Sequence, residues 1–211
     1  LPAAPQVTRE PSFELRELFL MSSMKPVAVI IIGDTPSACT DLIASLHTNP
    51  LIKKIIVLSS DAHPQQHAHV VTSPLPTGGK AVQEALEQAL ACEFTMIIPS
   101  PEGLDISPEE TEVFIAAARK NAAALCYADY YLGQRSSQNI RKVCDYQTGS
   151  IRDDFSFGPV LFYSSTHIKK AFEQFGALEA TQWAGLYELR LKASCTGSVL
   201  KIPSPLSCVR S

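Results

Sequence analysis

The amino-acid sequence predicts an α/β fold in which a largely parallel sheet is covered by helices on both faces. Two observations support this prediction. Short runs of β-branched and other apolar residues, such as Val27–Ile32, are hydrophobic throughout, as expected of strands that are buried on both faces. Segments with apolar residues at helical spacing separate these runs, and strands that alternate with helices indicate βαβ units.

The chain of 211 residues suits one domain with a small appendage, and 45% hydrophobic with 18% charged residues is ordinary globular composition. Residues 1–25 are expected to form an N-terminal extension with a short amphipathic helix, and residues 26–211 to form the α/β domain. The expected strands cover residues 27–32, 54–58, 70–71, 94–98, 124–128, 159–163 and 198–202. The expected helices cover residues 37–47, 80–91, 107–121, 166–175 and 187–193.

Helix-start signals support two of these assignments. Thr35 followed by Pro36 is typical of a capping residue and a proline at the first helical position. Residues 107–110 read Ser-Pro-Glu-Glu, which adds acidic side chains to the first turn, where they interact favourably with the helix dipole. The polar segment 134–141 is expected to be a loop.

Acidic residues follow four of the expected strands. Asp34 comes after the first strand, Asp61 after the second, Glu102 after the fourth and Asp129 after the fifth. In open α/β sheets, ligands bind beyond the carboxyl ends of the strands. The pattern therefore predicts a binding site at that edge of the sheet.

A second candidate segment is 149–158, in which Arg152, Asp153 and Asp154 stand between two glycines. Adjacent acids are poor material for a core, and loops held by a rigid scaffold often carry binding and catalytic groups. A purely structural alternative is that Arg152 pairs with one of the two acids and fixes a turn, because ion-pair networks resemble functional sites.

Several classes of protein are disfavoured. The first strand-to-helix turn has no G-x-G-x-x-G sequence and carries Pro36, which blocks the close approach of a pyrophosphate in NAD and FAD domains. Residues 74–81 depart from a P-loop at Pro74 and Ala81, although Lys80 and the glycines before it suit a phosphate contact. No G-x-S-x-G sequence is present, which argues against a hydrolase.

Charge, cysteine usage and hydropathy restrict partners and location. A net charge of −3 without a basic block does not suit nucleic-acid binding. The six cysteines form no C-x-x-C pair, which favours free thiols and a cytoplasmic location. No apolar run is long enough to span a membrane. The histidines at 63, 67 and 69 lie in an irregular segment without partners at zinc-site spacing, which disfavours a metal site there.

From residue 27 to residue 206, the order of elements resembles the family 2 glycosyltransferases. The strand Val27–Ile32 with Gly33 and Asp34 is similar to the opening strand of that family. Residues 54–61 resemble its second strand, residues 78–91 the helix under the donor site, and residues 94–102 the strand and acidic motif that hold a metal. The resemblance implies the GT-A fold, a three-layer α/β/α sandwich with a mostly parallel mixed sheet.

The resemblance also implies a site for a nucleotide-sugar donor and a glycan or other hydroxyl acceptor. Asp153 or Asp154 would be the catalytic base, and Glu102 would contact Mg²⁺ or Mn²⁺. The implied donor-binding residues are Gly33, Asp34, Asp61, Lys80, Asp129 and Arg152.

The sequence departs from the family at its acidic motifs. Ser59 and Ser60 replace aspartates, a single carboxylate, Glu102, remains at the metal motif, and glycine and leucine at 185–186 replace an acidic pair before the late helix. One carboxylate plus substrate phosphates can still hold Mg²⁺, and Asp129 is a possible second ligand. A cation such as Lys80 can instead stabilise the leaving group.

The leading hypothesis is therefore a family 2 glycosyltransferase that moves a sugar from a nucleotide-sugar donor to a hydroxyl acceptor. The alternative is a non-catalytic GT-A-like module that has lost the metal and the base. A nucleotidyltransferase is disfavoured, because no glycine-rich basic sequence follows the first strand.

Overall fold

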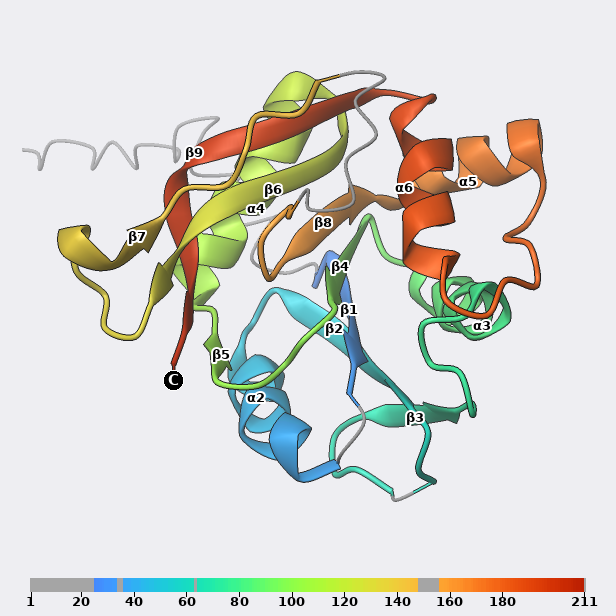
Figure 1. Cartoon of the computed structure of the whole chain (residues 1–211), viewed down its shortest axis with the longest axis horizontal. Coiled ribbons are helices and arrows are strands. Elements are labelled where there is room, and N and C mark those ends of the chain that lie inside the picture. Colours follow the sequence, from blue (N-terminus) through green and yellow to red (C-terminus); the bar gives the residue numbers. More distant parts are fainter. Residues whose placement is uncertain (1–24, 34–35, 63, 148–155, 211) are drawn as a thin grey trace, which may run out of the picture.

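The computed structural model describes residues 25–33, 36–62, 64–147 and 156–210. In chain order its elements are β1 (Val27–Ile32), α2 (Pro36–Thr48), β2 (Ile52–Ser59), β3 (His69–Thr72), α3 (Gly79–Ala89), β4 (Phe94–Ile98), β5 (Leu104–Asp105), α4 (Pro108–Asn121), β6 (Ala123–Leu132), η1 (Ser137–Asn139), β7 (Ile140–Arg141), β8 (Leu161–Ser164), α5 (Ser165–Phe175), α6 (Gly185–Ser194) and β9 (Ser198–Val209). They form one mixed, mostly parallel sheet with helices on both faces (Figure 1).

The order of strands in the sheet is β3-β2-β1-β4-β8-β6-β9-β5, and β7 pairs with β6. All six residues of β1 are buried, and β1 pairs in parallel with β2 on one side and with β4 on the other. A central strand covered on both faces explains why this segment is hydrophobic throughout. The predicted fold class is confirmed.

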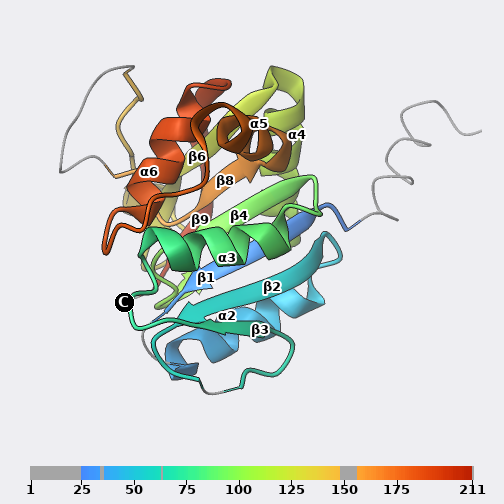
Figure 2. The ribbon, with the colours of Figure 1, turned by 90° about the vertical axis from the view of Figure 1, so that its right-hand side faces the viewer.

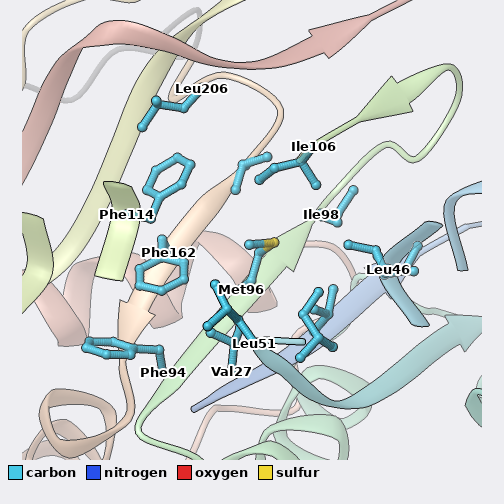
Figure 3. Close-up of a cluster of buried hydrophobic side chains, with 14 of the residues drawn as sticks. Val27, Leu46, Leu51, Phe94, Met96, Ile98, Ile106, Phe114, Phe162 and Leu206 are labelled. Atoms are coloured by element: carbon cyan, nitrogen blue, oxygen red, sulfur yellow. The ribbon is translucent and has the colours of Figure 1, made fainter. Parts of the chain in front are cut away.

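Successive residues of β1 point to opposite faces of the sheet and enter two separate cores. The first core packs under α2 and α4, and the second under α3, α5 and α6, which lie in front of the sheet in Figure 2. In the first core, the ring of Phe162 on β8 lies 5.0 Å from that of Phe94 and 5.3 Å from that of Phe114 (Figure 3). Two helical layers therefore fix the sheet from both sides.

The start of α4 confirms the predicted helix signal. The Ser107 hydroxyl accepts a hydrogen bond from the Glu110 amide at 3.2 Å, and the Glu110 carboxylate accepts one from the Ser107 amide at 2.8 Å. This reciprocal capping box satisfies two amides that would otherwise lack partners.

The structure adds details that the sequence patterns do not contain. β8 is antiparallel to both of its neighbours, β4 and β6, because the connection from β6 to β8 contains no crossover helix in its described part. β9 extends to Val209, well beyond the expected end at residue 202. The segment 134–141, expected to be a loop, contains the short helix η1 and the strand β7.

Candidate functional site

The topology brings the carboxyl ends of five strands to one edge of the sheet. β1, β2, β3 and β4 are mutually parallel, and β6 shares their direction because β8 runs antiparallel to both β4 and β6. Gly33, Asp61 and Glu102 follow strands at this edge, whereas Asp129, expected to follow a strand that ends at residue 128, lies within β6, which continues to Leu132. The shared edge predicted from the sequence is thus present among the described residues.

A cavity of about 420 Å³ lies where the connection from β3 to α3 meets the segment before α6. Lys80, in the first turn of α3, is the predicted donor-binding residue that lines it. Hydroxyl and amide side chains supply much of the remaining polar wall. The lining residues are Thr72, Ser73, Pro74, Leu75, Gly78, Lys80, Ala81, Glu84, Ala180, Thr181 and Gln182.

Glycines allow the two segments that line this cavity, the start of α3 and the residues before α6, to contact each other through their backbones. The Gly79 amide donates to the Thr181 carbonyl at 2.9 Å, and the Gly185 amide donates to the Thr77 carbonyl at 3.1 Å. A Cβ atom on Gly79 would lie 1.9 Å from the Glu179 carbonyl oxygen. Side chains larger than hydrogen at position 79 are therefore incompatible with this junction.

An ion pair on α6 holds the segment that approaches the cavity. Lys192 pairs with Glu188 at 2.8 Å and donates to the Gly176 and Ala177 carbonyls at 3.1 and 2.7 Å. Both Glu188 carboxylate oxygens accept from the Glu179 amide at 3.0 Å. These contacts tie residues 176–179 to α6 and position the wall formed by residues 180–182.

Gly33 and Asp61 occupy the ends of β1 and β2. The buried Gly33 donates its amide to the Leu58 carbonyl at 3.0 Å, which continues the pairing of the two strands. Asp61 is exposed, and its amide donates to the hydroxyl of the buried Ser59 at 3.1 Å. Both residues lie at the predicted edge, and their contact with a donor stays a prediction.

Asp129 is buried and takes part in a tertiary network. Its Oδ1 accepts the Val143 amide at 2.9 Å and lies 3.6 Å from the Lys201 ammonium, which also contacts Asp145 at 3.1 Å. Burial lowers the pKa of Lys201, but the two carboxylates raise it by more, so the pKa is raised overall. In these contacts Asp129 anchors residues 142–147 over β6.

Glu102 is exposed in the turn after β4, close to Cys39 on α2. Burial, and to a smaller extent the negative charge of Glu102, raise the pKa of the Cys39 thiol to about 11. Within the described ranges, no three His, Cys, Asp or Glu side chains gather where they could hold one metal ion. The ammonium of Lys201 beside Asp129 also makes that carboxylate a poor second ligand.

Asp34, Arg152, Asp153 and Asp154 lie outside the described residues. Sequence reasoning missed the contribution of residues 180–182 to the cavity, because that segment has no strand, helix or motif pattern. The structure begins α6 at Gly185, two residues before the expected helix, and packs this glycine against the backbone of residues 77–79.

These features define a mixed α/β protein with a glycosyltransferase-like fold, and solved glycosyltransferase structures share it. One is residues 1–349 of TarS from S. aureus, which is similar with a TM-score of 0.59 and 14% identity over 87% of this chain and 60% of that one. Its complex with UDP-GlcNAc gives a TM-score of 0.57 at 14% identity over 88% of this chain and 58% of that one.

The complex of TarS 1–349 with UDP gives a TM-score of 0.58 at 15% identity, over 88% of this chain and 60% of that one. At such identities the similarity establishes the fold alone, and this chain spans about 60% of the TarS 1–349 structures. No protein-family model and no curated protein matches the chain. In the part of the chain that the structure describes, every helix is too short or too polar to cross a lipid bilayer.

Proposed function

We propose that this chain is a glycosyltransferase of family 2 type that moves a sugar from a nucleotide-sugar donor to a hydroxyl acceptor. The single observation that carries the proposal is the cavity lined by Lys80, next to the shared edge of the strands. Ligands of open α/β sheets bind beyond this edge. The fold is shared with structures of TarS bound to UDP and UDP-GlcNAc, which supports a uridine nucleotide as the first donor to test.

In this proposal Lys80 stabilises the diphosphate of the donor. Its ammonium is exposed at the first turn of α3, where the helix dipole also favours a negative charge. Gly33, Asp34 and Asp61 would contact the nucleoside from the ends of β1 and β2. Arg152 would add a second cation toward the phosphates.

The catalytic base in this proposal is Asp153 or Asp154. Inverting and retaining transfer both require that the acceptor hydroxyl lose its proton. A carboxylate held next to the hydroxyl accepts that proton.

Glu102 would be the protein ligand of Mg²⁺ or Mn²⁺, with donor phosphates completing the coordination. The metal would neutralise the charge of the departing diphosphate. One carboxylate plus phosphates is a sufficient protein contribution for Mg²⁺. Asp129 is not proposed as a metal ligand, because its carboxylate already pairs with the Lys201 ammonium and accepts the Val143 amide.

Calorimetric titration with UDP and UDP-GlcNAc, with and without Mn²⁺, tests the proposal. We expect binding of either ligand to wild-type protein and a loss of about tenfold or more in Lys80→Ala, since a hydrogen bond to a charged group contributes roughly 1.5–3 kcal/mol. Lys120→Ala is the matched control, because Lys120 is exposed on α4 under the opposite face of the sheet. Equal affinities of the Lys80 and Lys120 variants would contradict the role of Lys80.

The second candidate is a non-catalytic module of the same fold. It is favoured by the absence, in the described ranges, of a cluster of three metal-ligating side chains. It predicts no binding of any nucleotide sugar, or binding that is followed by neither transfer nor hydrolysis. Product analysis by mass spectrometry after incubation with UDP-GlcNAc and Mn²⁺ separates the two functions.

A further inference from the structure

The start of α6 and the segment before it carry a row of exposed large side chains. Trp183 is 72% exposed, Leu191 43% and Tyr187 38%. Tyr187 and Leu191 are four residues apart and therefore share one side of the helix. Trp183 directly follows Gln182, which lines the cavity. The row thus leads from the mouth of the cavity along α6.

Arg190 adds a fixed positive charge to this row. Its guanidinium carbon lies 4.7 Å from the ring centre of Tyr187 and 4.7 Å from that of Phe157. Arg190 is only partly exposed, and no ion pair joins it to a carboxylate of the described residues. Stacking on two rings holds the guanidinium in one place, and its N–H groups make no hydrogen bond that would exclude a ligand in the part of the chain that the structure describes.

A buried hydroxyl is influenced by the charge of this cation. Tyr163 on β8 is fully buried, and its hydroxyl has no hydrogen-bond partner among the described residues. Burial raises the pKa of Tyr163, and the charge of Arg190 lowers it in part, which places the guanidinium within electrostatic reach. The cation therefore contacts two aromatic rings and has no counter-ion among the described residues.

We propose that Trp183, Tyr187 and Arg190 form the acceptor-binding surface and that the acceptor is a glycan carrying carboxylate or phosphate groups. This inference rests on the proposed function and adds the substrate class. The apolar C–H faces of sugar rings pack on exposed aromatic rings, which combine an apolar body with a polar tip. The planar guanidinium matches the geometry of a carboxylate or a phosphate.

The positive charge argues against a hydrophobic partner on the same surface. An apolar protein interface would bury Arg190 without a counter-ion from the described residues, and an uncompensated buried charge is strongly unfavourable. An anionic glycan supplies both the counter-ion and the flat apolar faces. The location beside the cavity also places such an acceptor next to the proposed donor.

Trp183 is the single tryptophan of the chain, so its fluorescence reports directly on this surface. The full chain is titrated with tetragalacturonic acid as the carboxylate probe, phosphorylated mannose oligosaccharide as the phosphate probe and maltotetraose as the neutral probe. We expect a change in emission with at least one anionic probe, at an affinity at least about tenfold higher than for maltotetraose. The affinity for the anionic probe should fall as the salt concentration rises. The probe that changes the emission shows whether the surface binds carboxylate or phosphate groups.

Variants of Arg190 test the charge separately from the rings. We expect Arg190→Gln to lower the affinity for the anionic probe about tenfold and to leave maltotetraose binding unchanged, while Arg190→Lys retains part of the preference. Arg141→Gln is the matched control, because Arg141 is exposed on β7, on the opposite side of the molecule from α6 in Figure 1. Circular dichroism verifies that each variant is folded.

Three outcomes would overturn the inference. One is emission that does not respond to either anionic probe while calorimetry shows that UDP binds, which leaves the proposed function intact. Another is equal affinity for anionic and neutral probes in wild type and Arg190→Gln. The third is emission that changes with protein concentration alone, which would assign the surface to a second copy of the chain. Binding of an anionic probe without binding of UDP supports the surface and contradicts the proposed transferase.

Discussion

Gly185 shows at the level of one residue why the first member of the acidic pair that the family carries before the late helix is absent. A Cβ atom at this position would lie 2.8 Å from the Gly79 amide nitrogen and 2.8 Å from the Thr77 carbonyl oxygen. Both neighbours are backbone atoms that cannot move away cheaply. A carboxylate side chain therefore has no room at position 185. The proposed catalytic base is instead Asp153 or Asp154.

Asp154→Asn tests this assignment. We expect the rate of sugar transfer to fall by about 10²–10⁴-fold, because the amide cannot accept the proton of the acceptor hydroxyl, while UDP binding stays nearly unchanged. Turnover of a nucleotide-sugar donor, followed by product analysis, is the measurement. Asp153→Asn is the matched neighbouring variant and identifies which acid acts. Unchanged turnover in both variants would refute the base.

At the scale of elements, the junction of α3 with α6 depends on direct backbone contact. Gly79→Ala places a methyl group 1.9 Å from the Glu179 carbonyl oxygen, so the junction must open. We expect a loss of about 1–3 kcal/mol in the free energy of unfolding, as for other overpacked sites. Weaker UDP binding should accompany it, because residues 180–182 move away from the cavity.

Urea unfolding followed by circular dichroism measures this effect, with Lys80→Ala as the control for stability. Lys80 neighbours Gly79 in the same helical turn but is exposed, so its truncation should change the free energy of unfolding by less than about 0.5 kcal/mol. Equal stability of the two variants would show that the junction adjusts without strain.

The attachment of residues 142–147 to β6 predicts a loss of stability at high pH. Burial raises the pKa of Tyr127 to about 12, above the value near 10 for an unfolded chain. A raised pKa means that the stabilising effect is complete below the unfolded value and is lost as the pH rises through the folded value. Stability should therefore fall between about pH 10 and pH 12.

Tyr127→Phe removes the ionisable hydroxyl and its hydrogen bond to the Cys144 carbonyl. At pH 8 we expect a loss of about 0.5–1.5 kcal/mol in the free energy of unfolding. Between pH 10 and pH 12 the variant should lose less stability than the wild type. Urea unfolding at pH 8 and pH 11 gives both values, and parallel pH profiles of the two proteins would contradict the prediction.

At the scale of the whole molecule, stability should decrease from the centre of the sheet to its edges. β1 is buried at all six positions and paired on both sides, whereas β3 is an edge strand with one buried residue of four. We expect the amides of β1 to exchange with solvent most slowly and those of β3 much faster. Hydrogen exchange with mass spectrometry tests this order, and equal rates in β1 and β3 would contradict it.

The sequence by itself determined the fold class and most of the elements. Hydrophobic runs such as Val27–Ile32 and the Ser-Pro-Glu-Glu start of α4 are local patterns, since burial on both faces and the start of a helix each leave a direct trace in residue order. The common edge of the strands also followed from these patterns, because parallel strands align their carboxyl ends.

Only the tertiary structure decided the direction of β8, the cavity lined by Lys80 and the aromatic row around Arg190. Each of these depends on contacts between residues far apart in the chain, such as Gly79 with Glu179 and Phe157 with Arg190. Residue order carries no periodic signal for such contacts. They arise when the helices pack on the sheet and bring distant segments within a few ångströms of each other.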